Sequence, residues 1–134
     1  MENIIQATIV AGVVLIKNNK YLLVQEKKKK AYGLWNLPAG KVEVGYTIEQ
    51  TAVKEAKEES GYDVKLIRKI DIFQENETVP VKHAFLAEII GGELNYPADE
   101  ILDAKWFSYE EILQLKDSLR GPWILSSIEQ VRNS

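Results

Sequence analysis

The sequence predicts an α/β architecture in which strands surround one central helix and further helices follow near the C-terminus. Three observations support this prediction: β-rich segments lie on both sides of residues 48–60, residues 48–60 carry helix signals at both ends, and two more helix starts follow residue 107. Such a set of elements forms either an α+β fold or an α/β/α sandwich, since both bury a sheet against helices.

The first strands are expected in the N-terminal quarter of the chain. Residues 8–16 are rich in β-formers, the Asn-Asn pair at 18–19 is a turn signal, and residues 21–24 form a second short apolar strand. Together they predict a hairpin. The lysine run at 27–30 then opens a polar loop that ends at Gly33.

The central helix is predicted over residues 48–60. Thr47 is a good N-cap, and Gln50 three residues later completes a capping box. Gly61 follows the last helical residue, where a left-handed C-cap favours glycine.

The second half of the chain predicts three more strands and two helices. Residues 64–73 and 79–90 form two strands joined by a polar turn, and residues 104–107 form a short final strand. A capping box at Ser108 starts one helix, and a last helix is expected over residues 122–132, because proline suits the first helical turn.

Composition is that of one globular domain spanning residues 1–134. The 134 residues are 46% hydrophobic and 28% charged, and the chain has no cysteine, which excludes disulfides, thiolate zinc sites and a cysteine nucleophile. The single histidine, His83, excludes a histidine-rich metal site. It is expected to occupy an ordinary strand position.

Charge and apolar runs suggest where the chain acts. Seventeen basic and twenty acidic residues give a net charge of −3, which argues against nucleic acid or an anionic membrane as partner. The first residues lack the basic start of a signal peptide, and the longest apolar run, 9–16, is far shorter than the roughly 20 residues that span a bilayer. We expect a cytoplasmic protein that is a monomer or a homodimer.

Three carboxylates are predicted to share one stripe of the central helix. At 100° per residue, Glu59 and Glu58 fall about 40° and 60° to either side of Glu55. Glu55 and Glu59 are a like-charge pair four residues apart, which weakens a helix unless something offsets the repulsion. A divalent cation held by hard oxygen ligands is one explanation, and a solvated acidic face is the other.

The surrounding residues resemble the Nudix box, G-x5-E-x7-R-E-U-x-E-E-x-G-U, where U is apolar. The matching positions are Gly40, Glu55, Ala56, Glu58, Glu59 and Gly61. The preceding Leu-Pro-Ala and the later Asp-Glu and Trp-Phe-Ser segments also resemble the family, so the likeness covers most of the chain. It implies an α/β/α sandwich with a central mixed sheet and the Nudix loop–helix.

Two positions depart from the box. Tyr46 stands where the pattern has its first glutamate, and Lys54 stands where it has arginine. In the family these two positions form a structural pair that supports the loop and helix. A contact between the Tyr46 hydroxyl and Lys54 is expected to replace it, although lysine lacks the bidentate fork of arginine.

The resemblance implies a small-molecule nucleotide substrate: the reaction is hydrolysis of a nucleoside diphosphate linked to another moiety, with Mg²⁺ or Mn²⁺ as cofactor. By position, Glu58 and Glu59 are the best metal ligands, Glu55 is a ligand or base, and the Gly40 or Ala39 carbonyl is a backbone ligand. Glu100 resembles a downstream glutamate that several members bring to the metals, and its alternative is an exposed loop carboxylate.

The favoured substrate is a purine nucleoside di- or triphosphate, including oxidised purines. Trp35 and Asn36 resemble the Trp-Asn of the oxidised-purine triphosphatases, where the amide contacts the base edge, although a turn asparagine is the alternative. In the lysine run at 27–30, Lys27 is the candidate for phosphate contact, and a solvated loop is the favoured alternative. Trp123, Tyr32 and Trp35 are candidates for stacking on the base. The Leu-Pro-Ala-Gly lead-in also fits an ADP-ribose or nucleotide-sugar pyrophosphatase, and a degenerate Nudix module that only binds or regulates is a further alternative.

Overall fold

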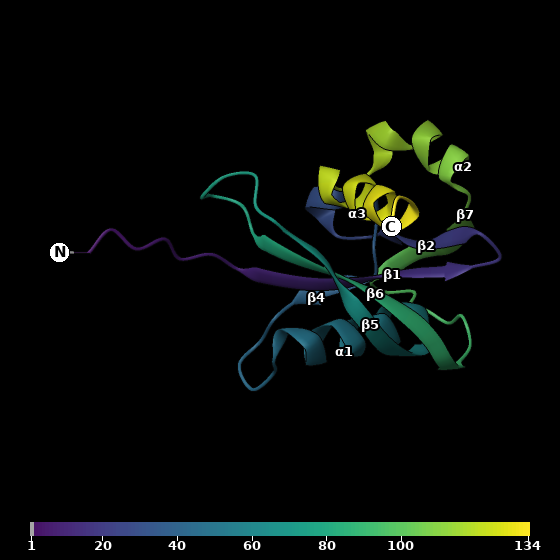
Figure 1. Cartoon of the computed structure of the whole chain (residues 1–134), viewed down its shortest axis with the longest axis horizontal. Helices are drawn as coiled ribbons and strands as arrows, with labels where there is room; N and C mark the ends of the chain where they lie inside the picture. Colours follow the sequence, from purple (N-terminus) through teal and green to yellow (C-terminus); the bar gives the residue numbers. More distant parts are fainter. Residues whose placement is uncertain (1) are drawn as a thin grey trace.

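The computed structural model describes residues 2–134, which form a mixed β-sheet with helices on both faces (Figure 1). The elements follow one another as β1 (Ile9–Lys17), β2 (Lys20–Glu26), β3 (Trp35–Asn36), β4 (Ala39–Lys41), α1 (Ile48–Ser60), β5 (Tyr62–Phe73), β6 (Val81–Gly92), β7 (Ile101–Phe107), α2 (Tyr109–Gln114) and α3 (Pro122–Arg132). The predicted α/β/α sandwich is confirmed.

Strand β1 lies at the centre of the sheet. The strand order is β3-β2-β1-β6-β5, while β4 pairs with β1 and β7 pairs with β2. The pairing of β1 with β6 is parallel and the other pairings are antiparallel, which makes the sheet mixed. Because β4 pairs with β1, the segment just before α1 is held at the middle of the sheet.

Alternation along β1 divides the core between two faces. Val13 and Leu15 are fully buried on the face that α1 covers, and Val14 is fully buried on the opposite face, against α3. A strand buried on both faces needs a continuous apolar sequence, as β1 has. Figure 1 shows α1 below the sheet and α2 and α3 above it.

The helix ends match the sequence prediction. The Thr47 hydroxyl accepts from the Gln50 N–H at 3.0 Å, and the Gln50 side chain accepts from the Thr47 N–H at 2.9 Å. Gly61 ends α1 in the left-handed region at φ 84°. The capping box at Ser108 is present, and α3 begins at proline and covers the predicted residues.

Two short strands and several strand ends differ from the sequence prediction. β3 and β4 have two and three residues, which is too few for a periodic pattern. β5 begins two residues before the predicted start, and β7 begins three residues before its own. These ends depend on partner strands rather than local sequence. None of the helices between residues 2 and 134 is long and apolar enough to cross a membrane.

Candidate active site

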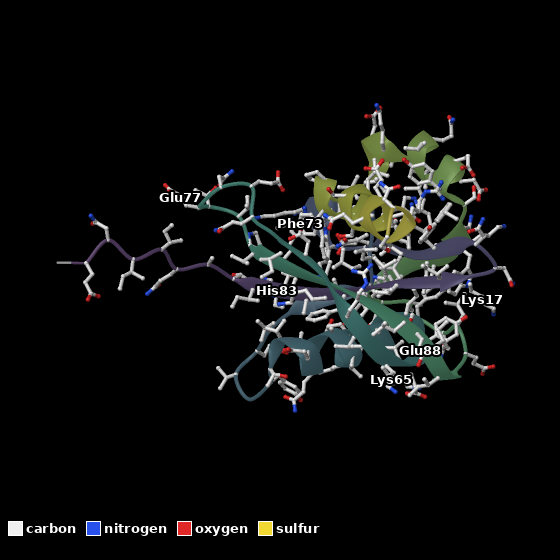
Figure 2. The ribbon with its side chains drawn as sticks, viewed as in Figure 1. Lys17, Lys65, Phe73, Glu77, His83 and Glu88 are labelled. Atoms are coloured by element: carbon white, nitrogen blue, oxygen red, sulfur yellow. The ribbon has the colours of Figure 1, made fainter. Side chains whose placement is uncertain are left out.

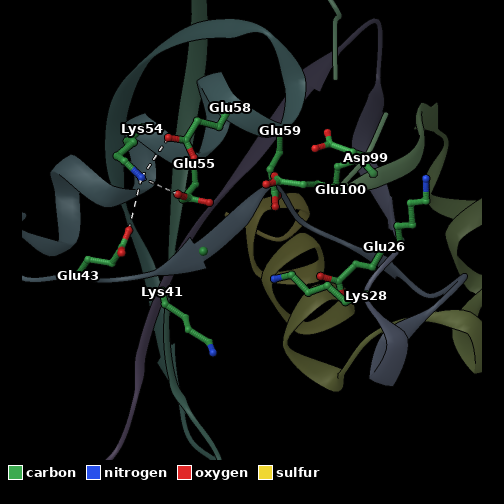
Figure 3. A pocket seen from close by; sticks show the side chains of 13 residues that line it. Glu26, Lys28, Lys41, Glu43, Lys54, Glu55, Glu58, Glu59, Asp99 and Glu100 are labelled. Carbon is green, nitrogen blue, oxygen red and sulfur yellow. Dashed lines mark hydrogen bonds and ion pairs between the residues drawn. The ribbon is translucent and has the colours of Figure 1, made fainter. Parts of the chain in front are cut away.

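A cleft of about 430 Å³ lies beside α1, at the ends of β2 and β4 (Figure 3). Its walls are formed by Glu26, Lys27, Lys28, Gly40, Lys41, Glu43, Lys54, Glu55, Glu58, Glu59, Asp99, Glu100 and Ile101. Seven of these residues are acidic and four are lysines, so negative charge predominates. Such a cleft suits a divalent cation together with an anionic substrate.

The α1 carboxylates face this cleft together, as the helical spacing predicts. Glu59 is only 8% exposed and accepts a hydrogen bond from the N–H of Ala39 at 2.9 Å. The Glu55 side chain is 13% exposed, and that of Glu58 is 48% exposed. The stripe therefore passes from the buried edge of the helix toward solvent.

Burial perturbs two of these carboxylates. Desolvation raises the pKa of Glu59 to about 8; the Ala39 N–H opposes this shift, and the charges of Glu55 and Glu26 add to it. Burial also raises the pKa of Glu55, against the opposing effect of the Lys54 ammonium. A positive charge in the cleft would favour the ionised form of both side chains.

Strand β4 passes close to the Glu55 side chain. A Cβ placed on Gly40 would overlap the Glu55 carboxylate, so a larger residue there would displace this carboxylate from its position in the cleft. Hydrogen bonds run from the N–H of Val13 to the carbonyl of Pro38 and from the N–H of Val42 to the carbonyl of Ile9. In an antiparallel pair, every second residue bonds to the partner strand, so the N–H and C=O of Ala39 point away from β1. This N–H donates to Glu59.

Of the four lysines that line the cleft, Lys54 is the one whose ammonium contacts the α1 carboxylates. Its Nζ lies 3.1 Å from Glu55 Oε2 and 3.1 Å from Glu58 Oε1, and these contacts hold the pKa of Lys54 above its usual range. The expected contact with the Tyr46 hydroxyl is not what forms: Lys54 Nζ lies 5.3 Å from the centre of the Tyr46 ring. A cation–π contact with the ring takes the place of the expected hydroxyl contact.

The donor set fits a hard divalent cation, although it is not assembled as a finished cage. Among residues 2–134, no three histidine, aspartate or glutamate side chains converge as cation ligands. The Lys54 ammonium holds Glu55 and Glu58 instead, and the Ala39 N–H holds Glu59. Glu55 and Glu58 therefore share one positive charge, the Lys54 ammonium, as carboxylate ligands share a divalent cation.

The lysine run contributes differently from what its sequence suggests. Lys27 lines the cleft, but its ammonium donates to the carbonyl of Ala98 at 3.0 Å and so anchors the 97–101 segment. Lys28, a member of the same lysine run, also lines the cleft, and so does Lys41, which no sequence motif marked. The positive charge of Lys28 opposes the rise in the pKa of Glu59. The pairing of β4 with β1, which brings in Lys41, left no local sequence signal.

Glu100 lies in the cleft with two acidic residues that sequence analysis did not assign. Asp99 lines the cleft next to it, as Figure 3 shows. Glu26, at the end of β2, is 8% exposed and forms an ion pair with Arg120 Nε at 3.0 Å, without hydrogen-bond alignment. Asp99 directly precedes Glu100, so the same sequence segment could have indicated it. No sequence pattern distinguishes Glu26 from other strand residues.

Trp35 and Trp123 do not lie in the cleft, which corrects the expectation that they stack on a base. Trp35 is 7% exposed and packs edge-on against Phe107 at a centroid distance of 4.9 Å. Trp123 is 2% exposed and packs against Phe73 at 6.5 Å. Both rings belong to the core on the α3 side, because burying so much apolar surface outweighs leaving it exposed.

Asn36 lies beside the cleft rather than in its wall. It pairs with Val24 across β2 and β3, and opposite residues of a strand pair point to the same face. Glu26, a cleft residue, is two residues further along β2. The Asn36 Oδ1 accepts from the N–H of Leu37 at 2.9 Å, which orients the amide. Tyr32, by contrast, is 63% exposed.

Comparison with known proteins agrees with the fold. The family model of the NUDIX domain matches residues 7–125. The chain is 37% identical over 111 residues to the 8-oxo-dGDP phosphatase of Danio rerio, covering 81% of this chain and 34% of that protein. It is 35% identical over 107 residues to the NAD-capped RNA hydrolase of Pectobacterium carotovorum, covering 77% of this chain and 40% of that protein.

A solved NUDIX hydrolase from Nitrosomonas europaea superposes with a TM-score of 0.84 at 26% identity, covering 96% of this chain and 90% of that one. This chain spans about a third to two fifths of the length of the two curated relatives. The matched residues include β4, α1 and the carboxylates of the cleft. The chain therefore belongs to the NUDIX domain family.

Proposed function

We propose that this chain is a divalent-metal-dependent Nudix pyrophosphohydrolase that cleaves a nucleoside diphosphate-linked compound. The observation that carries the proposal is the cleft that Glu55, Glu58 and Glu59 share with four lysines. Carboxylates that bind a cation and lysines that bind phosphate are the two requirements of pyrophosphate chemistry.

Glu58 and Glu59 would hold Mg²⁺ or Mn²⁺, with Glu55 as a third ligand or as the base. The Ala39 carbonyl is the better placed backbone ligand, since it points away from the β1 ladder, while Gly40 provides the space that Glu55 needs. When bound, the metal would supply charge neutralisation at the diphosphate and an activated water molecule.

The remaining cleft residues would bind and orient the substrate. Lys28 and Lys41 would neutralise the phosphate oxygens, and Lys27 would act indirectly by anchoring the segment that carries Glu100. Glu100 would complete the acidic wall opposite α1. Fixed charges of this kind stabilise a transferring phosphoryl group because they need not reorganise during the reaction.

The substrate class that we propose is a purine nucleoside di- or triphosphate, including oxidised purines. The pairing of Asn36 with Val24, two residues before Glu26 of the cleft, supports this proposal, because it puts the amide on the same face of the sheet as the cleft. Its amide offers donor and acceptor groups that suit a purine edge. The substrates of the two relatives, an 8-oxo-dGDP phosphatase and an NAD-capped RNA hydrolase, share a nucleoside diphosphate group but differ in the rest of the molecule.

The metal role is tested with Glu59→Gln. This change should leave the fold intact while lowering kcat at least about 100-fold with Mg²⁺ or Mn²⁺, because it removes a charged ligand. Glu88→Gln, on β6 outside the cleft, is the matched control and should keep normal turnover. Near-normal turnover by Glu59→Gln would reject the assignment, and inactivity of the unmodified chain on every nucleotide would favour a binding module.

The substrate class is tested by comparing purine and pyrimidine nucleoside phosphates with ADP-ribose. A purine nucleoside di- or triphosphate should have the highest kcat/KM. Asn36→Ala should lose about 1–3 kcal/mol of discrimination between purine and pyrimidine, while hydrolysis of inorganic triphosphate changes little. Equal loss on all substrates would show that Asn36 only shapes the loop, and a preference for ADP-ribose would establish the alternative activity.

A further inference from the structure

The Lys54 ammonium lies among three carboxylates rather than two. Besides Glu55 and Glu58, each at 3.1 Å, Glu43 Oε1 lies 3.8 Å from Nζ. Figure 3 shows these three contacts on one side of the cleft. An ammonium has three N–H donors, so one lysine can contact three carboxylates. The contact with Glu43 is an ion pair without a hydrogen bond, because its distance is too long for one.

A turn explains why Glu43 reaches this lysine. The N–H of Tyr46 donates to the carbonyl of Glu43 at 3.2 Å, which closes the segment between β4 and α1 into a turn. Gly45 permits the turn with its positive φ of 95°. The first and last residues of the turn therefore lie side by side, so that both the Glu43 carboxylate and the Tyr46 ring contact Lys54.

The three carboxylates differ in their freedom to move. The Glu43 side chain is 72% exposed and belongs to a loop, whereas that of Glu55 is 13% exposed and fixed on α1. Glu55 and Glu58 are also the side chains that the proposed function assigns to a divalent cation. That cation and the Lys54 ammonium cannot both take the same carboxylate oxygens, since like charges at such a distance repel.

We infer that Glu43 is a positioning residue that replaces the missing glutamate at position 46: it retains Lys54 when Glu55 and Glu58 bind the divalent cation. In the metal-free chain, Lys54 holds the two α1 carboxylates in place as an internal cation. On metal binding, the ammonium remains with Glu43 and the Tyr46 ring. This inference rests on the proposed function, because it needs a cation at Glu55 and Glu58.

The experiment measures Mn²⁺ affinity of the full chain, without substrate, by the electron paramagnetic resonance signal of free Mn²⁺. Glu43→Gln should weaken Mn²⁺ binding about five-fold, since Lys54 then competes fully for Glu55 and Glu58. Glu88→Gln has the same change in net charge and should bind Mn²⁺ normally. Circular dichroism confirms that each variant folds.

A double-mutant cycle separates this role from simple charge attraction. In a Lys54→Met background, Glu43→Gln should change Mn²⁺ affinity less than about two-fold, because no ammonium remains to be held. Tyr46→Glu should restore the affinity of Glu43→Gln, since it places a carboxylate on the other end of the turn. A five-fold loss that persists in Lys54→Met would overturn the inference, and so would failure of the Tyr46→Glu rescue.

The two proposals fail in different ways. If the unmodified chain binds no Mn²⁺, both the metal-dependent function and the role of Glu43 are rejected. If the unmodified chain binds Mn²⁺ and Glu59→Gln does not, but Glu43→Gln binds normally, only the role of Glu43 is rejected.

Discussion

At the scale of single residues, His83 illustrates how tertiary surroundings determine protonation. The ring is 8% exposed on β6 (Figure 2), and its Nδ1 lies 3.0 Å from the Lys69 ammonium. Because ammonium can only donate, Nδ1 accepts and Nε2 carries the proton. Burial lowers the pKa of His83, Lys69 lowers it further, and Glu49 opposes the shift.

The contribution of His83 to stability depends on pH because of this shift. Since the folded pKa of His83 lies below the ordinary value of 6.5, the unfolded chain binds more protons between the two values. The contribution of His83 is therefore complete above pH 6.5 and is lost as the pH falls through 6.5 toward the folded pKa. In urea unfolding from pH 8 to pH 5, the stability of the unmodified chain relative to His83→Gln should fall. Glu55 and Glu59, whose raised pKa values act in the opposite direction over this range, are common to both proteins and cancel in the comparison.

A direct titration checks the same prediction. The chain has one histidine, so its ring proton signals in NMR are unambiguous. Their midpoint should lie below 6.5 in the folded chain and should rise when Lys69→Met removes the neighbouring charge. A midpoint at or above 6.5 in the unmodified chain would contradict the argument.

At the scale of elements, α1 depends on its ends as much as on its apolar face. The capping box satisfies N–H groups at the start, and Gly61 closes the last turn with its N–H on the carbonyl of Lys57. A Cβ at Gly61 would also collide with the carbonyl oxygen of Glu93. Two features of Gly61 therefore fix the C-terminal end of α1, next to Glu58 and Glu59: its left-handed backbone conformation and the lack of room for a side chain.

Two alanine substitutions separate these effects. Gly45→Ala, at φ 95° and with open space around the Cβ, should cost about 1 kcal/mol of stability from backbone strain alone. Gly61→Ala, at φ 84°, should cost at least about 1 kcal/mol more, because the strand end near Glu93 must also move. Urea unfolding measures both, and equal losses would show that the collision is relieved without cost.

At the scale of the whole molecule, one sheet connects two apolar cores. Leu22 and Leu23 are neighbours on β2 and are both fully buried, but Leu22 faces the α1 side and Leu23 faces the α3 side. Strands β1 and β2 contribute to both cores. Loosening either core should therefore affect the same folding equilibrium.

Truncation on each face tests this coupling. Leu22→Ala and Leu23→Ala should each cost about 2–5 kcal/mol, and each should shift one cooperative transition rather than create a second. Fluorescence of the tryptophans in the two cores and far-ultraviolet circular dichroism should give the same midpoint. Separate midpoints for the two probes would show that the two faces unfold independently.

Local sequence was sufficient for the features whose causes lie within one helical turn or one strand. The capping boxes at Thr47 and Ser108, the end of α1 at Gly61 and the start of α3 at proline follow from hydrogen bonds between near neighbours. The shared stripe of Glu55, Glu58 and Glu59 follows from helical geometry alone. The motif register then placed this stripe in a known family.

Only the tertiary structure decided which distant residues meet. It placed Glu43 at Lys54, brought Lys28 and Asp99 to the cleft, and buried Trp123 in the core instead of leaving it for a base. These outcomes depend on the pairing of β4 with β1, the fold of the 97–101 segment and the packing of α3 on the sheet. A sequence pattern does not contain them, because long-range pairing and burial are decided by the free energy of the whole chain rather than by neighbours along it.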